Sequence, residues 1–173
     1  MSPTSTQPLQ MSSSELDELF ASSPAGAIPE GRGTGTVVVV PGTRFTKPLA
    51  AVARAVLWQG KSFRPGTHDL LNYLSPFGRL GIRAMVRQDK SLIDGRPCIV
   101  LDYSETSRAA RKVRDEIRQI GPHEYLGLVY TDGRKLKVYF LLSFATAGEA
   151  GDTAVTPAGR ATPAAPAADG SRR

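Results

Sequence analysis

The stretch that decides the fold is Glu124-Tyr-Leu-Gly-Leu-Val-Tyr-Thr131, then Asp132-Gly133, then Arg134-Lys-Leu-Lys-Val-Tyr-Phe-Leu-Leu-Ser-Phe144. An Asp-Gly pair between two β-rich runs predicts a β-hairpin, because a type I′ turn needs a positive φ at both central positions. With a two-residue loop, the partners on one face are Val129 with Leu136, Gly127 with Val138 and Tyr125 with Phe140. On the other face, Tyr130, Leu128 and Leu126 lie opposite Lys135, Lys137 and Tyr139. The first face is apolar apart from Gly127 and the second is mixed and basic, so we expect one dry face and one solvated face.

The length of 173 residues fits one domain between two tails. Residues 1–13 carry no charge, and residues 146–173 are rich in Ala, Pro, Gly and Thr. Neither tail can bury enough apolar surface to offset its ordering entropy, so both are expected to be disordered, with the domain at residues 14–145. Acidic and basic residues balance in the tails, so the net charge of +6 belongs to the domain.

Cys98 is the only cysteine, which excludes an intramolecular disulfide and fits a reducing compartment. It stands in an apolar run and is expected to be buried. The N-terminus lacks the pattern of a signal peptide, and no apolar stretch reaches about 18 residues, so no membrane span is expected. These observations predict a soluble, cytoplasmic protein.

The rest of the chain predicts a series of short elements. A capping box at Ser14-Glu-Leu-Asp17 indicates a helix to residue 21, and residues 34–40 are expected to form a strand buried on both faces. A second helix over 46–60, a strand at 61–63, a weak helical turn at 69–74, and strands at 82–87 and 97–103 follow. Residues 107–120 fit both helical and strand periodicity.

Sequential antiparallel strands joined by short turns point to a meander that closes into a barrel. The predicted fold is therefore mainly β: an antiparallel barrel with one or two short helices near the N-terminus.

The segment Leu57-Trp-Gln-Gly-Lys-Ser-Phe63 carries a Trp-x-Gly-Lys-x-Phe pattern after a predicted helix. This pattern resembles small bacterial lipocalin-like (calycin-type) proteins of the GXWXG class. The chain is more similar to an uncharacterised actinobacterial family with segments like Cys98-Ile-Val-Leu-Asp-Tyr103, Val113-Arg-Asp-Glu-Ile-Arg118 and Tyr125-Leu-Gly127. The resemblance spans residues 16–144, but Gly33-Thr-Gly35-Thr-Val37 lacks the tryptophan of the GXWXG pattern. It implies a cup-shaped lipocalin-like barrel around an apolar cavity, and it favours a short helix at 107–112 followed by a strand to residue 120.

The candidate ligand-binding residues are those expected to line the inside of such a barrel: Trp58, Phe63, Tyr103, Tyr125, Gly127, Val129, Val138 and Phe140. Three polar residues on or beside predicted strands, Tyr125, Asp102 and Glu116, are candidates for acid–base chemistry in a dry cavity. The alternative for Asp102 and Glu116 is an ion pair at the barrel rim. A tryptophan like Trp58, at a helix end that faces the sheet, is more often a core plug than a platform for a ligand.

The first function hypothesis is the binding of a hydrophobic or amphipathic small molecule, lipid-like or polyketide-like, in the barrel. The second is a cofactor-free cyclase or isomerase that acts on a polyene or polyketide by positioning it. The third and least favoured uses the basic cluster Arg108, Arg111, Lys112, Arg114 and Arg118 to bind nucleic acid or an anionic surface, although Asp115 and Glu116 interrupt that cluster.

Cofactor motifs are weak in this sequence. His68 and His123 have no partners at metal-ligand spacing, so no metal site is expected. The glycines at 31–35 precede a strand and are not followed by a P-loop lysine, which argues against a phosphate loop. We therefore expect no cofactor and a hydrophobic small molecule as the partner, with nucleic acid unlikely and a homodimer left open.

Overall fold

The structure is a computed structural model that describes residues 7–39, 60–73, 81–108 and 110–145. The second helix expected over residues 46–60 lies outside this part up to residue 59, as does Trp58. The tails at residues 1–6 and 146–173 also lie outside it.

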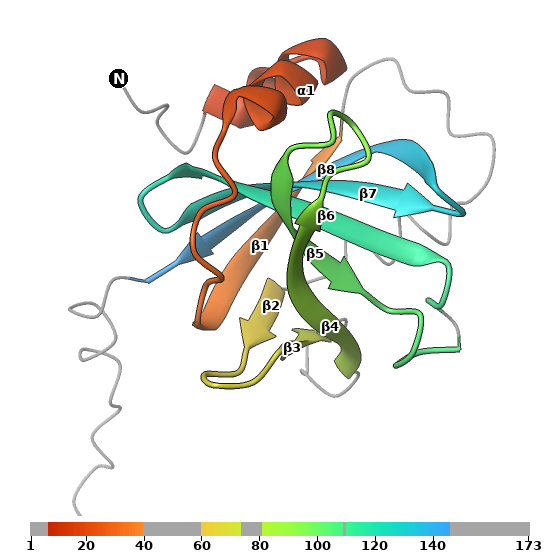
Figure 1. Cartoon of the computed structure of the whole chain (residues 1–173). Helices are drawn as coiled ribbons and strands as arrows, with labels where there is room; N and C mark the ends of the chain where they lie inside the picture. The colour runs from red at the N-terminus through yellow and green to blue at the C-terminus, as the bar shows by residue number, and fades with distance from the viewer. Residues whose placement is uncertain (1–6, 40–59, 74–80, 109, 146–173) are drawn as a thin grey trace, which may run out of the picture.

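The described residues form eight strands in one closed antiparallel barrel in which each strand pairs with the next along the chain (Figure 1). Pairing of the first and last strands, from Gly33 opposite Phe144 to Val39 opposite Val138, closes the barrel. The strands are β1 Gly31–Val39, β2 Gly60–Phe63, β3 Asp69–Tyr73, β4 Gly81–Lys90, β5 Pro97–Asp102, β6 Val113–Gly121, β7 Glu124–Thr131 and β8 Arg134–Phe144. The predicted antiparallel barrel is thus confirmed.

The β7–β8 hairpin turns at Asp132 and Gly133, whose φ angles of 49° and 72° are those of a type I′ turn. Next to the turn, Tyr130 pairs with Lys135 as predicted. The register then shifts, because Val129 alone lies opposite the three residues 136–138 of β8. Gly127 therefore pairs with Phe140 and Tyr125 with Leu142, so the predicted partners Val138 and Phe140 are wrong by two residues. A shift of two leaves every side chain on its predicted face.

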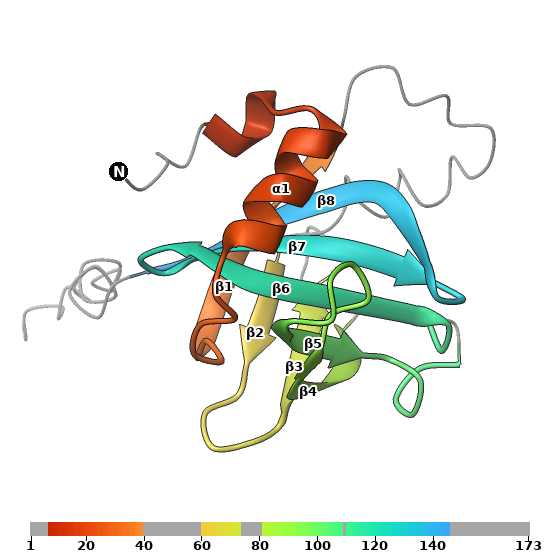
Figure 2. The same ribbon diagram turned by 45° about the horizontal axis from the view of Figure 1, so that its top comes forward.

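Both faces of the hairpin are buried, which corrects the expectation of one solvated face. The helix α1, Ser13–Ser22, lies over the outside of β6, β7 and β8 (Figure 2). Its Leu16 and Phe20 pack on an outer cluster that includes Cys98, Leu126, Leu128, Tyr139 and Leu141. Lys135 forms an ion pair with Asp17 of α1, while Lys137 is exposed.

Arg118 of β6 fastens the end of α1 to the barrel wall. Its guanidinium is fully buried, donates to the carbonyl oxygens of Phe20 (3.0 Å) and Ala21 (3.3 Å), and pairs with Asp94 at 2.7 Å. Asp94 belongs to the turn between β4 and β5. Because it binds carbonyl groups of α1 as well as Asp94, this single side chain of β6 joins the end of α1 to that turn.

Several local expectations differ from the structure. The helix cap is Ser12 with Glu15, two residues before the predicted capping box. The expected helical turn at 69–74 is strand β3, because pairing with β2 and β4 outweighs the weak helical pattern. Residues 110–112 form a turn and not a helix, whereas the strand expected up to residue 120 is confirmed as β6.

The beginning of the chain also differs. β1 starts at Gly31 and exposes Thr34 and Thr36, so it is not buried on both faces. A 3-10 helix at Gln7–Gln10, with Pro8 buried, stands where the composition predicted no structure. Within the described ranges, no helix is both long and apolar enough to cross a membrane.

Candidate functional site

Four polar side chains meet inside the barrel around the ammonium group of Lys61. Lys61 Nζ donates to Asn72 Oδ1 and to the hydroxyl oxygen of Tyr103, both at 2.7 Å, and to Asp115 Oδ2 at 2.8 Å. The Lys61 side chain is only 3% exposed and that of Asp115 7%. We call Lys61, Asn72, Tyr103 and Asp115 the Lys61 network.

The strand alternation places all four side chains in the interior. Lys61, Asn72, Tyr103 and Asp115 each stand two residues from an interior core residue, namely Phe63, Leu70, Leu101 and Ile117. Gly60 is required just before Lys61, because it has a φ of 132° and a Cβ there would lie 2.1 Å from the Gly33 carbonyl oxygen. The Gly-Lys pair of the Trp-x-Gly-Lys-x-Phe segment therefore brings β2 close to β1 and directs Lys61 inward.

Hydrogen bonds within the network satisfy its members. The Tyr103 hydroxyl accepts from Asn72 Nδ2 at 2.7 Å and donates to Asp115 Oδ2 at 2.9 Å. Asn72 also donates to the carbonyl oxygen of Ile82 at 3.3 Å. An ammonium has three protons, and three acceptors lie around Lys61 Nζ.

Burial controls the ionisation of the network. Desolvation lowers the pKa of Lys61, although the neighbouring Asp115 carboxylate opposes that change. Desolvation also raises the pKa of Tyr103 well above its usual 10, and Asp115 adds to this effect. Tyr103 is therefore a neutral phenol at physiological pH and can donate a proton in a hydrogen bond.

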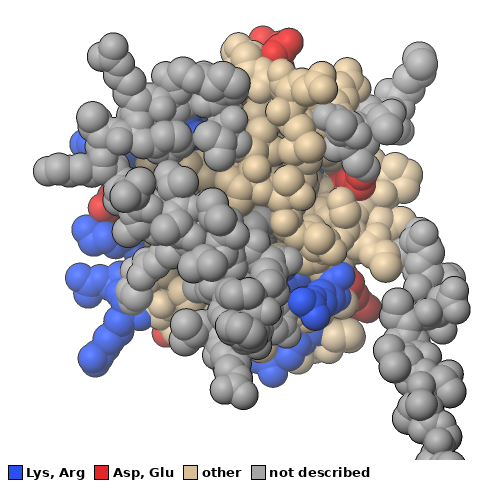
Figure 3. Space-filling model, turned by 180° about the vertical axis from the view of Figure 1, so that it is seen from behind, with Lys and Arg blue, Asp and Glu red and all other residues tan. Residues whose placement is uncertain are grey.

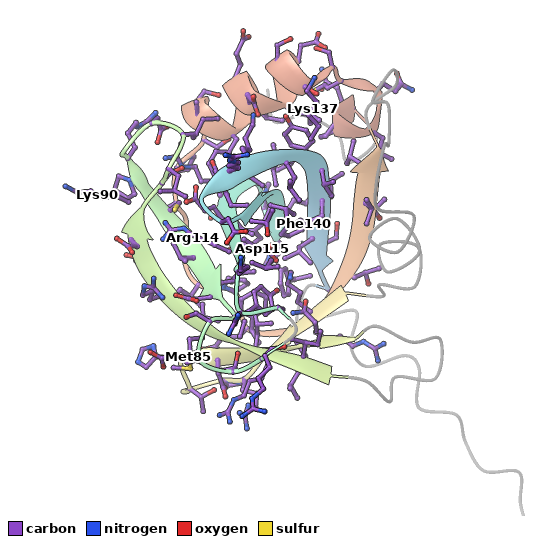
Figure 4. All side chains as sticks on the ribbon, turned by 90° about the vertical axis from the view of Figure 1, so that its right-hand side faces the viewer. Met85, Lys90, Arg114, Asp115, Lys137 and Phe140 are labelled. Carbon is purple, nitrogen blue, oxygen red and sulfur yellow. The ribbon has the colours of Figure 1, made fainter. Side chains whose placement is uncertain are left out.

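Phe140 of β8 forms the apolar side of this site. Its ring centroid lies 5.0 Å from Lys61 Nζ, so the ring offers a cation–π contact to the ammonium group. The Phe140 ring also covers Gly127, where a Cβ would lie 2.1 Å from Phe140 Cζ. Figure 4 shows Phe140 and Asp115 within the barrel outline, while Met85 and Lys90 lie on its outside.

The network lies toward one end of the barrel. At this end β5 ends and β6 begins, and residues 103–112 connect them. The β7–β8 turn lies beside this connection, as the hydrogen bond from the Asp132 amide to the Lys112 carbonyl oxygen at 3.0 Å shows. We call this the network end; it faces the viewer in Figure 4. The other end carries the β2–β3, β4–β5 and β6–β7 turns.

The structure divides the predicted ligand-binding residues between the two ends. Tyr103 and Phe140 belong to the Lys61 site, Gly127 lies under Phe140, Val129 packs against the interior core, and Val138 is half-buried in the irregular part of β8.

Phe63 and Tyr125 lie at the opposite end. Both rings pack edge to face on Phe144, with centroid distances of 5.7 Å. Trp58 is outside the described residues.

The three predicted acid–base candidates do not come together. The Tyr125 ring belongs to the interior cluster at the far end, and its hydroxyl donates to the Ala27 carbonyl oxygen at 2.8 Å. Asp102 is on the outer face, paired with Arg87 at 2.8 Å. Glu116 is buried on the outer face, where it accepts hydrogen bonds from Ser91 Oγ and from the Leu92 amide. Asp115 and Tyr103, each next in sequence to one of these carboxylates, occupy the interior instead.

Period-two alternation was the signal that could have identified the correct pair. Residues 99 and 101 share one face of β5, Tyr103 continues this alternation just past the end of the strand, and residues 115 and 117 share the same face of β6, since Leu101 pairs with Asp115. The apolar Ile99, Leu101 and Ile117 mark this face as the interior, which assigns Tyr103 and Asp115 to it.

A surface pocket of about 280 Å³ lies at the opposite end, between the β2–β3 turn and residues 28–30. Asp69 on its wall is paired with Arg64 and Arg83. Hydrogen bonds from Arg64 and Thr67 hold the pKa of Asp69 far below its usual range. In the described part of the chain, no group of three His, Cys, Asp or Glu side chains is placed to hold a metal ion.

Comparison with known proteins identifies the fold and not the function. No protein-family model matches the sequence, and no curated protein does. Among solved structures, the crystal structure of a protein from Thermomonospora curvata is similar, with a TM-score of 0.54 and 20% sequence identity over 77% of this chain and 87% of that one. The chain therefore shares its barrel fold with the Thermomonospora curvata protein.

Proposed function

We propose that the barrel binds an apolar or amphipathic small molecule at the network end, with the Lys61 network holding the ligand's polar group. The observation that carries this proposal is a fully buried, ion-paired lysine in an otherwise apolar interior. The resemblance to lipocalin-like proteins supports the same function class.

The energetics of the pair argue against a purely structural role. Moving a lysine and an aspartate out of water costs several kcal/mol for each ion, and an apolar pair of similar size is often as stable or more stable, by ~1–4 kcal/mol. Buried ionisable groups with shifted pKa values are concentrated at functional sites. A ligand site in a barrel also needs this combination of an apolar wall and a few convergent polar groups.

The charge arrangement favours a ligand with a neutral oxygen, such as a ketone, aldehyde or alcohol. Lys61 already has three acceptors, so a ligand oxygen would enter by replacing one of them, and the neutral Asn72 Oδ1 is the least costly to displace. A ligand carboxylate at that position would lie beside the negative charge of Asp115 and would be repelled.

The cyclase or isomerase hypothesis is the second candidate, and one observation favours it. The Tyr103 hydroxyl lies between Lys61 and Asp115 and remains protonated. A neutral phenol and an ammonium in a dry site are donors that can stabilise an oxyanion or enolate as it develops. In this second hypothesis, Tyr103 replaces Tyr125, Asp102 and Glu116 as the acid–base candidate.

The test is ligand binding by native mass spectrometry and thermal shift with matched long-chain alcohols, aldehydes, methyl ketones and fatty acids. Tyr103→Phe and Lys61→Met should weaken the binding of the neutral oxygenated ligands. Tyr130→Phe is the matched control, because its buried hydroxyl is on the outer face and has no hydrogen-bond partner among the described residues. Absence of binding across the panel would refute the proposal, and a preference for the fatty acids would refute the choice of a neutral oxygen.

Catalysis is tested separately on linear polyene and polyketide substrates. Product formation that is lost in Tyr103→Phe and kept in Tyr130→Phe would support the second hypothesis. Binding without conversion in the wild-type protein would leave binding as the function.

A further inference from the structure

We propose that the network end of the barrel docks on an anionic lipid surface through a basic rim, which we define as Arg108, Arg111, Lys112 and Arg134. The rim residues are all exposed and come from the two turns that lie side by side at this end. Lys137, also exposed, follows on β8.

The rim differs from the rest of the barrel in how its charges are compensated. Away from the rim, most described basic side chains are in ion pairs, for example Arg87 with Asp102, Arg114 with Glu116 and Arg118 with Asp94. At the rim, only Lys112 is paired, with Asp132 at 3.0 Å. Arg108, Arg111 and Arg134 form no ion pair with any described residue, so their charge faces solvent.

The structure therefore divides the basic cluster that the sequence suggested. Arg114 and Arg118 form ion pairs with Glu116 and Asp94. Arg108, Arg111 and Lys112 are exposed to solvent. Figure 3 shows Lys and Arg side chains projecting at its left edge, which is the right-hand side of Figure 1, where the network end lies.

A lipid surface fits the rim better than a nucleic acid does. Single-stranded nucleic acids are bound by exposed aromatic rings on which the bases stack, and the exposed large apolar side chains of the described residues are Leu9, Met85 and Leu92, with no aromatic among them. An anionic membrane needs only positive charge near its surface. The choice of a lipid surface also rests on the proposed function, since an apolar ligand would enter and leave through the end that touches the membrane.

Vesicle co-sedimentation of the full chain tests the rim directly. Phosphatidylcholine vesicles are compared with vesicles that also contain phosphatidylglycerol, at low and high salt and without any added ligand. We expect binding to the phosphatidylglycerol vesicles alone, and weaker binding at high salt because the contact is electrostatic.

The variant Arg108→Gln/Arg111→Gln should bind about 25-fold more weakly, from roughly fivefold per basic residue at an anionic surface. Lys90→Glu is the matched control, because it changes the net charge by the same amount from an exposed position at the other end of β4, about 17 Å along the strand from Met85, which pairs with the last residue of β5. It should bind much more nearly as the wild type does, since that distance is about two Debye lengths of about 8 Å.

Equal losses in the two variants would overturn the proposal, as would binding to phosphatidylcholine alone. Binding to a single-stranded oligonucleotide that is tighter than binding to the vesicles, and that is weakened by Arg108→Gln/Arg111→Gln, would overturn the lipid proposal in favour of a nucleic acid. Tyr103→Phe separates this proposal from the proposed function: it should keep vesicle binding while it loses ligand binding. Vesicle binding without any ligand binding would support the role of the rim and refute the proposed function.

Discussion

Asp115→Asn tests whether the Lys61 network is a buried ion pair. The substitution keeps the shape of the side chain and removes the only carboxylate within hydrogen-bond distance of Lys61 Nζ among the described residues, while Asn72 and Tyr103 remain in place. Both partners are almost fully buried, with side-chain exposures of 3% and 7%. Leaving one charge of such a pair uncompensated costs about 3–5 kcal/mol in the free energy of unfolding.

Lys61→Met should cost a similar amount, since it leaves the Asp115 carboxylate unpaired. The double variant Lys61→Met/Asp115→Asn contains neither charge, so we expect a loss of only about 1–2 kcal/mol, the range for a partly satisfied polar group. The four proteins form a double-mutant cycle, with a coupling of at least about 4 kcal/mol between the two sites.

The assay is equilibrium unfolding in guanidinium at pH 7, with the slopes compared so that only midpoint changes count as stability changes. Single-variant costs that add to within about 0.5 kcal/mol in the double variant would refute the pairing, because independent sites behave in that way. A loss in Asp115→Asn below about 1 kcal/mol, the typical upper value for an exposed ion pair, would show that water reaches the network.

Three further predictions concern packing, the α1 junction and pH. Gly127→Val should displace the Phe140 ring and cost about 1–3 kcal/mol by overpacking, because a Cβ at that position would lie 2.1 Å from Phe140 Cζ. Unchanged stability would contradict the close contact between Gly127 and the ring. Arg118→Met should release the end of α1 from the barrel and expose Cys98. Burial raises the pKa of the Cys98 thiol to about 12, so the exposed thiol of the variant should react with a disulfide reagent far faster than that of the wild type. Equal reaction rates would contradict the role of Arg118 in holding α1. Burial raises the pKa values of Tyr103, Tyr125, Tyr130 and Tyr139 above the usual 10.0, so the folded protein keeps protons that the unfolded chain loses. These phenols should therefore leave the free energy of unfolding unchanged below pH 10 and lower it as the pH rises above 10. In a pH titration, tyrosinate absorbance should appear together with unfolding. Ionisation of most tyrosines before unfolding would contradict their burial.

The hairpin was predictable because its decisive residues act locally. Asp132 and Gly133 impose the turn by their own backbone preferences, and the β-rich runs on either side have no competing helical pattern. The register beyond Tyr130 was not predictable, because the irregularity in β8 opposite Val129 depends on how β8 curves around the barrel.

The candidate site was predictable only in part. Tyr103 and Phe140 were expected to face the interior and do so, but the acidic candidates were chosen without using the alternation of β5 and β6. Lys61 was the harder case, since a lysine in a four-residue strand gives no sign of burial until Asp115, more than fifty residues later, is placed beside it. The covering of the outer face by α1 depends on the same kind of long-range contact.

The closing pair of strands bears on how this chain folds. The hydrogen-bonded pairing of β1 with β8, from Gly33–Phe144 to Val39–Val138, joins segments about a hundred residues apart. Such non-local pairing has a large loop-closure entropy and makes folding slow. Until β8 arrives, β1 and β7 are both open edges that can pair with another chain. We therefore expect truncation within β8 to produce aggregation of the whole chain and not a smaller stable barrel.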